Sequence, residues 1–175
     1  MTCGAACLGS LAPHHRANDR GRRRGEPHLT GDALEKARQY HRRIPFTEHL
    51  GIKVAELHDG VARIELALRP EHCNSFGTAH GGVLMTLLDV ALCQAARTQH
   101  PDSAGIMTID MATSFIAGGE GRLVAEGRVL KPGRTTIFAE AEVRNADGTL
   151  VAKAIGTVRA RRAEHAPTSS STKKG

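Results

Sequence analysis

One long apolar helical segment limits most strongly how this chain can fold. The stretch "GGVLMTLLDVALCQAART" predicts a helix from Gly81 to Thr98. Its apolar side chains point to nearly all sides of that helix: Val83, Leu84, Leu87, Leu88, Val90, Ala91 and Leu92. A helix that is apolar almost all round must be wrapped by other protein. A single sheet covers only one side of it, so we expect a partner subunit to cover the other.

The segments around this helix read as strands, two before it and four after it. The first pair, "IKVAELHDGVARIELALR", alternates apolar and polar residues on both arms of a hairpin. The turn-forming pairs between strands are Asp59-Gly60, Pro132-Gly133 and Asp147-Gly148. The sequence therefore predicts an α+β fold, with an antiparallel six-stranded sheet wrapped around one long central helix.

The formal charge of +6 comes from the two ends of the chain. Residues 1–30 hold five arginines against Asp19 and Glu26, and residues 31–160 carry equal numbers of basic and acidic side chains. We expect a disordered basic extension over 1–30, a domain over 31–162 that begins with a short helix from Asp32 to about Arg42, and a disordered tail over 163–175. The neutral middle and 3% aromatic content give no basis for nucleic-acid binding. No apolar run is long enough to span a membrane, so a cytoplasmic protein is expected.

Asp89 is the most unusual residue of the long helix, because it is a lone carboxylate among leucines and valines. Three interpretations fit this position: an aspartate held by a nearby hydroxyl such as Thr86, an aspartate on a solvent-facing line, or a general base or nucleophile in a dry cleft. The helix begins with Gly81 and Gly82, whose amides lack intrahelical partners and can bind an anion or a developing oxyanion.

The spacing of these groups argues against one chain using both on the same small substrate. Gly82 and Asp89 are seven residues apart, or about 10 Å along a helix axis, and His80 and Asp89 about 13 Å. If a helix-start amide and Asp89 cooperate, they come from neighbouring antiparallel helices of two chains, as a two-fold dimer would provide.

The segment "NSFGTAHGGVLMTLLD" resembles the signature of the PaaI-like acyl-CoA thioesterases of the hotdog fold, and the likeness covers about residues 46–160. The resemblance implies hydrolysis of an acyl-CoA thioester, with Asp89 as base or nucleophile and the amide of Gly81 from the partner subunit polarising the carbonyl. It further implies that His80 and Asn74 orient the substrate and that Thr108 helps to position the water. Members of this family form homodimers that commonly pair into homotetramers.

Coenzyme A is part of the expected substrate, and no cofactor or metal is expected. Its phosphates require basic side chains near the mouth of the cleft, and Lys131 and Arg134 are the candidates. Gly82, at the helix start, is a further candidate for substrate binding. Ordinary turn charges explain Lys131 and Arg134 at least as well.

Two alternative functions stay open. One is a non-catalytic module that binds acyl-CoA, and the other is an enoyl-CoA hydratase, which is disfavoured because no histidine follows Asp89 before His100. The chain contains no G-x-S-x-G motif of a serine hydrolase and no HExxH motif of a zinc hydrolase.

Overall fold

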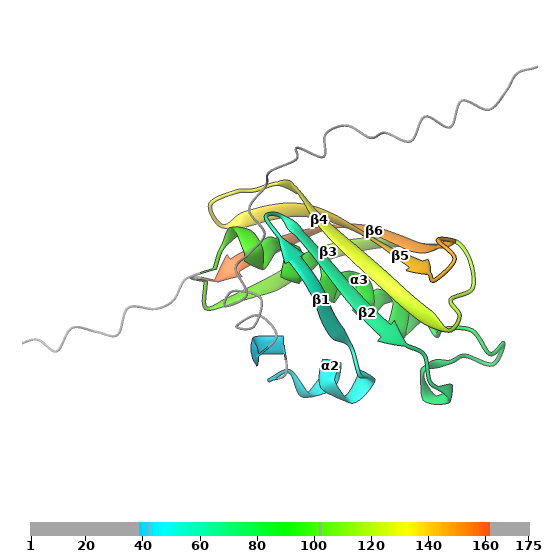
Figure 1. Ribbon diagram of the computed structural model, residues 1–175. Coiled ribbons are helices and arrows are strands. Elements are labelled where there is room, and N and C mark those ends of the chain that lie inside the picture. Colours follow the sequence, from blue (N-terminus) through cyan, green and yellow to red (C-terminus); the bar gives the residue numbers. More distant parts are fainter. Residues whose placement is uncertain (1–38, 42, 102, 162–175) are drawn as a thin grey trace, which may run out of the picture.

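The computed structural model describes residues 39–41, 43–101 and 103–161 (Figure 1). The expected extension over 1–30 and the tail over 163–175 lie outside the described residues. Most of the helix expected from Asp32 also lies outside them, although residues 39–41 are helical. No helix in the described part of the chain combines the length and apolarity needed to cross a bilayer.

The described elements follow the order expected from the sequence, with two strands, one long helix and four strands after a short helix. Their bounds are α2 Pro45–Leu50, β1 Lys53–His58, β2 Val61–Ala67, the 3-10 helix η1 Pro70–His72, α3 Gly81–Gln99, β3 Gly105–Phe115, β4 Arg122–Lys131, β5 Thr136–Asn145 and β6 Leu150–Arg161. The long helix thus ends one residue later than expected, and the loop before it contains η1.

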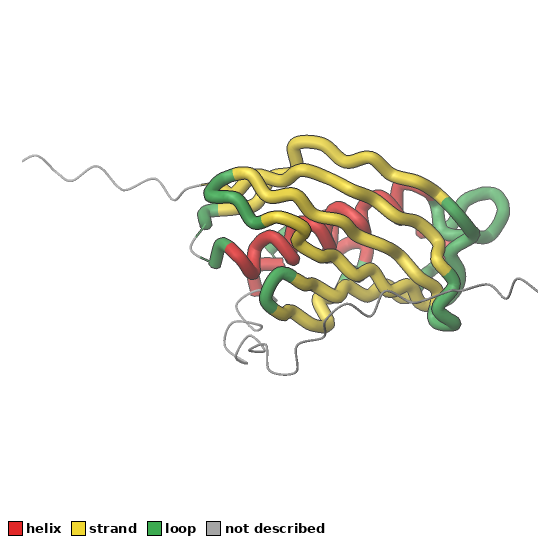
Figure 2. Tube along the Cα trace, turned by 90° about the horizontal axis from the view of Figure 1, so that it is seen from above, coloured by secondary structure: helices red, strands yellow, loops and turns green. Residues whose placement is uncertain are grey.

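The six strands form one antiparallel sheet in the order β1-β2-β4-β5-β6-β3. The sheet curls around α3, which lies along its concave side (Figures 1 and 2). This confirms the expected α+β fold class. Because β1 and β3 are the two edges, the side of α3 that lies between them has no strand over it.

Small residues on the inner face bring the sheet close to the helix. Alanines occupy buried positions on β4, β5 and β6, and leucines of α3 fill the space between: Ala125, Ala139, Ala141, Ala152, Ala154, Leu84, Leu87, Leu88 and Leu92. At Gly127 the two backbones approach closely, since a Cβ there would lie 2.2 Å from the carbonyl oxygen of Ala91. The core therefore consists mainly of the contact between α3 and the curved sheet.

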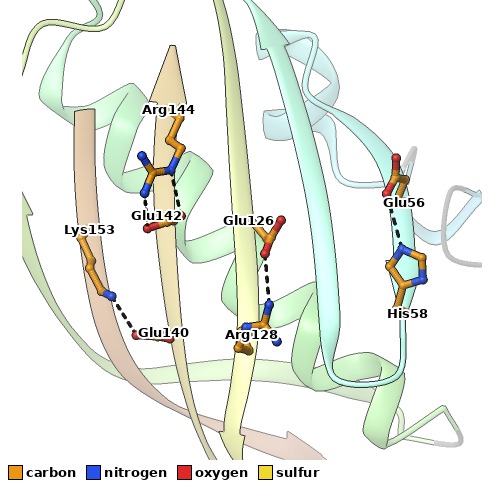
Figure 3. Close-up of polar contacts among 8 residues, drawn as sticks. All are labelled: Glu56, His58, Glu126, Arg128, Glu140, Glu142, Arg144 and Lys153. Atoms are coloured by element: carbon orange, nitrogen blue, oxygen red, sulfur yellow. Dashed lines mark hydrogen bonds and ion pairs between the residues drawn. The ribbon is translucent and has the colours of Figure 1, made fainter. Parts of the chain in front are cut away.

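The outer face of the sheet carries charged side chains in pairs (Figure 3). The guanidinium of Arg144 donates two hydrogen bonds to Glu142, at 2.9 and 3.0 Å, and Lys153 lies 2.9 Å from Glu140. These pairs remain partly exposed to solvent, so each contributes little to stability. They are typical of a solvated surface, so the candidate site is sought on the inner side of the sheet.

Candidate active site

The open side of α3 carries a row of residues that the sheet does not cover. Gly82 and Met85 are exposed, and Thr86, Asp89 and Cys93 are half-buried, whereas the rest of the helix is largely buried. These residues recur every three or four positions and therefore lie on one face. The helix is thus apolar on the sheet side, and Asp89 belongs to its uncovered side.

A cleft of about 420 Å³ runs along this uncovered side. One wall comes from the segment that contains α2, and the other from the edge strand β3. Its surface is mainly apolar, and among the described residues Asp89 is the single acidic residue that lines it. The lining residues are Tyr40, His41, Ile44, Phe46, Thr47, Met85, Thr86, Asp89, Val90, Cys93, Gln94, Arg97, Ile106 and Met111. A carboxylate in such surroundings has few competing polar groups.

Asp89 is held by a hydroxyl from the other wall. Thr108 on β3 donates a hydrogen bond to Oδ1 of Asp89. The register of β3 with β6 shifts between Thr108 and Asp110, and a bulge of this kind re-aims the neighbouring side chains. Thr86, the hydroxyl considered from the sequence, instead donates to the carbonyl oxygen of Gly82 at 2.8 Å.

Cys93 lies one helical turn after Asp89, and no functional role is expected for it from the sequence. Its Sγ is 3.3 Å from the Oγ1 of Thr108. Burial, together with the nearby charge of Asp89, raises the pKa of the Cys93 thiol to about 11. The side chain is therefore a neutral thiol at physiological pH, and the i, i+4 spacing from Asp89 is the signal that could have pointed to it.

The start of α3 is capped by His80, whose Nδ1 accepts a hydrogen bond of 3.0 Å from the N–H of Gly82. Within the described residues, no protein atom accepts a hydrogen bond from the N–H of Gly81, the first residue of the helix. The two glycines expected at a binding site thus differ, since only the amide of Gly81 is free to meet a ligand.

Asn74 organises the loop that leads into α3. Its Oδ1 accepts hydrogen bonds from the N–H groups of Phe76 and Thr78, at 2.9 and 3.3 Å, and its Nδ2 donates to the hydroxyl of Thr78 at 3.1 Å. Gly77 completes the turn in the left-handed region, with φ of 77°. In this chain Asn74 therefore shapes the approach to the helix start.

The expected residues do not all meet within one chain. Eight residues, or about 12 Å of helix, separate Gly81 from Asp89. The end of β4, with Lys131 and the nearby Arg134, lies at the opposite end of α3. The N–H of Val129 donates a hydrogen bond to the carbonyl oxygen of Gly60, and the N–H of Gly60 donates to the hydroxyl of Thr98 in the last turn of the helix. A single chain thus brings together Asp89, Thr108 and Cys93, and leaves the helix-start amide and these basic residues apart.

The wall lined by Tyr40, His41, Ile44, Phe46 and Thr47 was not assigned to the site from the sequence. Arg97 of α3 lies over the ring of Tyr40, with 3.8 Å from its guanidinium carbon to the ring centroid. His41 is 3% exposed, its Nε2 donates to the carbonyl oxygen of Ile52 at 3.2 Å, and burial lowers its pKa. Within the described ranges, no group of three or more His, Cys, Asp or Glu side chains is arranged to hold a metal ion.

Comparison with known proteins places the chain in a family. Residues 76–152 match the profile of the thioesterase superfamily. A putative esterase of Saccharolobus solfataricus is 36% identical over 109 residues, which cover 62% of this chain and 77% of that protein. The chain belongs to the thioesterase superfamily. Its matched segment contains the helix start, Asp89 and Thr108.

Two further similarities place the chain within the PaaI-like hotdog thioesterases. Acyl-coenzyme A thioesterase 13 of Pongo abelii is 30% identical over 125 residues, which cover 69% of this chain and 84% of that protein. The PaaI protein of E. coli, from the phenylacetic acid degradation operon, shares the fold, with a TM-score of 0.68, 22% identity and coverage of 75% of this chain and 95% of that one. The hotdog fold implied by the sequence is therefore confirmed.

Proposed function

We propose that this thioesterase hydrolyses an acyl-CoA to the free acid and coenzyme A, with Asp89 as the base or nucleophile. The observation that carries the proposal is the placement of Asp89 as the acidic residue of a 420 Å³, mainly apolar cleft, with one carboxylate oxygen bonded to Thr108. The other oxygen is left to take a proton from water or to attack the thioester carbon.

The reaction needs a base, an oxyanion site and a leaving thiolate. As a base, Asp89 takes a proton from water while the water oxygen bonds to the thioester carbon. The negative charge moves to the carbonyl oxygen, where the amide of Gly81 from a second copy stabilises it. The C–S bond then breaks, and the thiolate of coenzyme A leaves and takes up a proton. His80 and Asn74 contribute by holding the helix start and its loop around the substrate carbonyl.

A second copy of the chain completes this site, because one chain keeps Gly81 about 12 Å from Asp89. The surface available for the second copy is the edge strand β3, which presents unpaired backbone groups over 11 residues. Its apolar side chains are exposed, with Met107 at 49% and Ile109 at 57%. Antiparallel pairing of two such edges would bring the start of one α3 toward the middle of the other.

Basic residues support the binding of the coenzyme A phosphates. Arg134 lines a cavity of about 620 Å³ together with Arg159 and Arg161. Arginine binds phosphate oxygens through paired N–H groups. We propose that Arg134, with Lys131 near by, contacts the nucleotide part of the substrate. Gly82 contributes only space at the helix start, because its amide is already bonded to His80.

The test is release of free thiol from a panel of short-chain, long-chain and aromatic acyl-CoAs by the purified full-length protein. We expect turnover of at least one of these classes. Asp89→Asn should fold normally and lose at least about a thousandfold in kcat on the best substrate, because the amide can neither accept the proton nor attack the thioester carbon.

Asp110→Asn is the matched control, since Asp110 lies on the same edge strand with an exposed side chain. This variant should retain the turnover of the wild type. Full activity of Asp89→Asn would remove Asp89 from the mechanism, and tight acyl-CoA binding without thiol release by the wild type would indicate a non-catalytic binding module.

A further inference from the structure

Three side chains from two elements form a continuous hydrogen-bonded row where β3 meets the uncovered side of α3. Thr108 on β3 bonds Oδ1 of Asp89, and its Oγ1 lies 3.3 Å from the Sγ of Cys93. Asp89 and Cys93 are one turn apart on α3, so their side chains point along the same face of the helix. Thr108 thus stands opposite both of them and touches each.

The chemistry of the three groups determines which group donates and which accepts each hydrogen bond in this row. An ionised carboxylate only accepts hydrogen bonds, so the single proton of the Thr108 hydroxyl is used on Asp89. The hydroxyl oxygen can then only accept from its other neighbour, which makes the thiol of Cys93 the donor. Because burial and the charge of Asp89 raise the pKa of Cys93 to about 11, the thiol retains its proton at neutral pH.

We propose that Cys93 is a positioning residue of the thioesterase site, whose S–H orients the Thr108 hydroxyl so that its proton points to Asp89. Donation from sulfur to oxygen fixes the rotation of the hydroxyl, and hydrogen bonds arranged in such a chain polarise one another. One oxygen of Asp89 is thereby held against β3, and the other takes no part in this row. This inference rests on the proposed function and adds a residue that acts through Thr108.

An ordinary apolar filler would behave differently from a donor at this position. Cys93 is only half-buried and borders the cleft next to the carboxylate, whereas the filler positions of α3 that face the sheet carry leucine and alanine. A nucleophilic cysteine is also disfavoured, since reactive cysteines have lowered pKa values and that of Cys93 is raised. Hydrogen bonding to Thr108 is the interaction that remains.

A double-mutant cycle tests whether Cys93 acts through Thr108. The variants are Cys93→Ala, Thr108→Val and the double variant, with kcat and KM measured on the best acyl-CoA. We expect Cys93→Ala to lower kcat about three- to tenfold with little change in KM, which corresponds to the loss of one neutral hydrogen bond. In the Thr108→Val background the same change should alter kcat less than about twofold, because the partner is already gone.

Two further variants separate a donor from a space-filling group. Cys93→Ser retains a hydrogen-bond donor and should restore a large part of the activity that Cys93→Ala loses. Cys73→Ala, at the other free cysteine of the described chain, should retain wild-type kinetics, because the thiol of Cys73 donates to the backbone carbonyl of Arg69 and contacts neither Asp89 nor Thr108. Independent effects of Cys93→Ala and Thr108→Val, or equal losses in the alanine and serine variants, would overturn the proposal.

A readout that does not depend on turnover separates this inference from the proposed function. The S–H stretching band of Cys93 in the Raman spectrum should lie at the lowered frequency of a donor and move to that of a free thiol in Thr108→Val. Protein without Cys93 identifies the band. An unmoved band would contradict the hydrogen bond, whereas absence of thioester hydrolysis in the wild type would contradict the proposed function alone.

Discussion

His41 is a buried polar residue that lines the cleft and ties its segment to the residue before β1. Its ring is 3% exposed, and its Nε2 donates to the carbonyl oxygen of Ile52. Its Nδ1 is buried and has no partner among the described residues. Burial lowers the pKa of His41 from the ordinary value of 6.5, so the ring is neutral in the folded protein near pH 7.

The lowered pKa of His41 predicts a loss of stability in mild acid. The unfolded chain takes up a proton at this ring once the pH falls below about 6.5, whereas the folded chain resists it. The stabilising contribution is therefore complete above the unfolded pKa and is lost as the pH falls toward the folded pKa.

The free energy of unfolding, measured by urea titration between pH 8 and pH 5, should fall less steeply for His41→Gln than for the wild type. The comparison at pH 8, where the ring is neutral in both states, isolates the packing cost of the substitution. Equal pH dependence of the two proteins would contradict the assignment.

At single residues, the sequence identified the acid more readily than its partner. Asp89 stands out because a carboxylate interrupts an apolar helix, and this anomaly is visible in the letters alone. Its hydroxyl partner was sought at Thr86, in the same helix, and the structure gives Thr108, which is 19 positions later. Contacts between elements depend on register, which residue spacing within one helix does not provide.

Among elements, the pairing of α3 with β4 sets how deeply the helix enters the sheet. The two backbones lie close together where Gly127 faces Ala91, and no side-chain atom separates them there. The leucines on either side can then reach the inner face of the sheet. A glycine in a strand interior often marks this kind of close approach.

A Cβ at position 127 should force these two elements apart. Gly127→Ala would place it 2.2 Å from the carbonyl oxygen of Ala91, so we expect a loss of about 3 kcal/mol in the free energy of unfolding. The matched control is Gly105→Ala in β3, whose nearest atom would be the Tyr40 hydroxyl at 4.0 Å. Chemical denaturation should show the control within about 1 kcal/mol of the wild type; similar losses in both variants would contradict the close approach.

For the whole molecule, the open face of α3 and the exposed edge β3 are continuous with each other. Met111 of β3 lines the same cleft as Asp89, and Thr108 of β3 donates a hydrogen bond to Asp89. A long edge strand with exposed apolar side chains is a surface that proteins normally pair or cover. Pairing with a second copy would satisfy this edge and also complete the proposed site.

A charge on this edge should therefore separate the proposed dimer. Ile109→Lys places an ammonium group at a 57%-exposed position of β3, and we expect a folded monomer with at least about tenfold lower kcat/KM. Ile155→Lys is the control, because Ile155 is 55% exposed but lies on β6, an interior strand that is already paired on both sides by β5 and β3.

Native mass spectrometry reports the oligomeric state, and circular dichroism reports whether the variants are folded. The native mass also distinguishes a dimer from the tetramer that the family resemblance implies. A wild type that is monomeric at assay concentrations and fully active would contradict the two-chain site.

The sequence by itself determined the elements and their order, because helical and strand periodicity and turn-forming glycine pairs are local properties. It also determined that Gly81 and Asp89 of one chain lie too far apart to share a small substrate, since that distance follows from helix rise alone. Only the tertiary structure decided which side of α3 stays open, that Thr108 and Cys93 meet at Asp89, and that Tyr40, Phe46 and Thr47 line a wall of the cleft. These features depend on sheet order, the bulge in β3 and the path of distant segments, and all three arise from packing between elements.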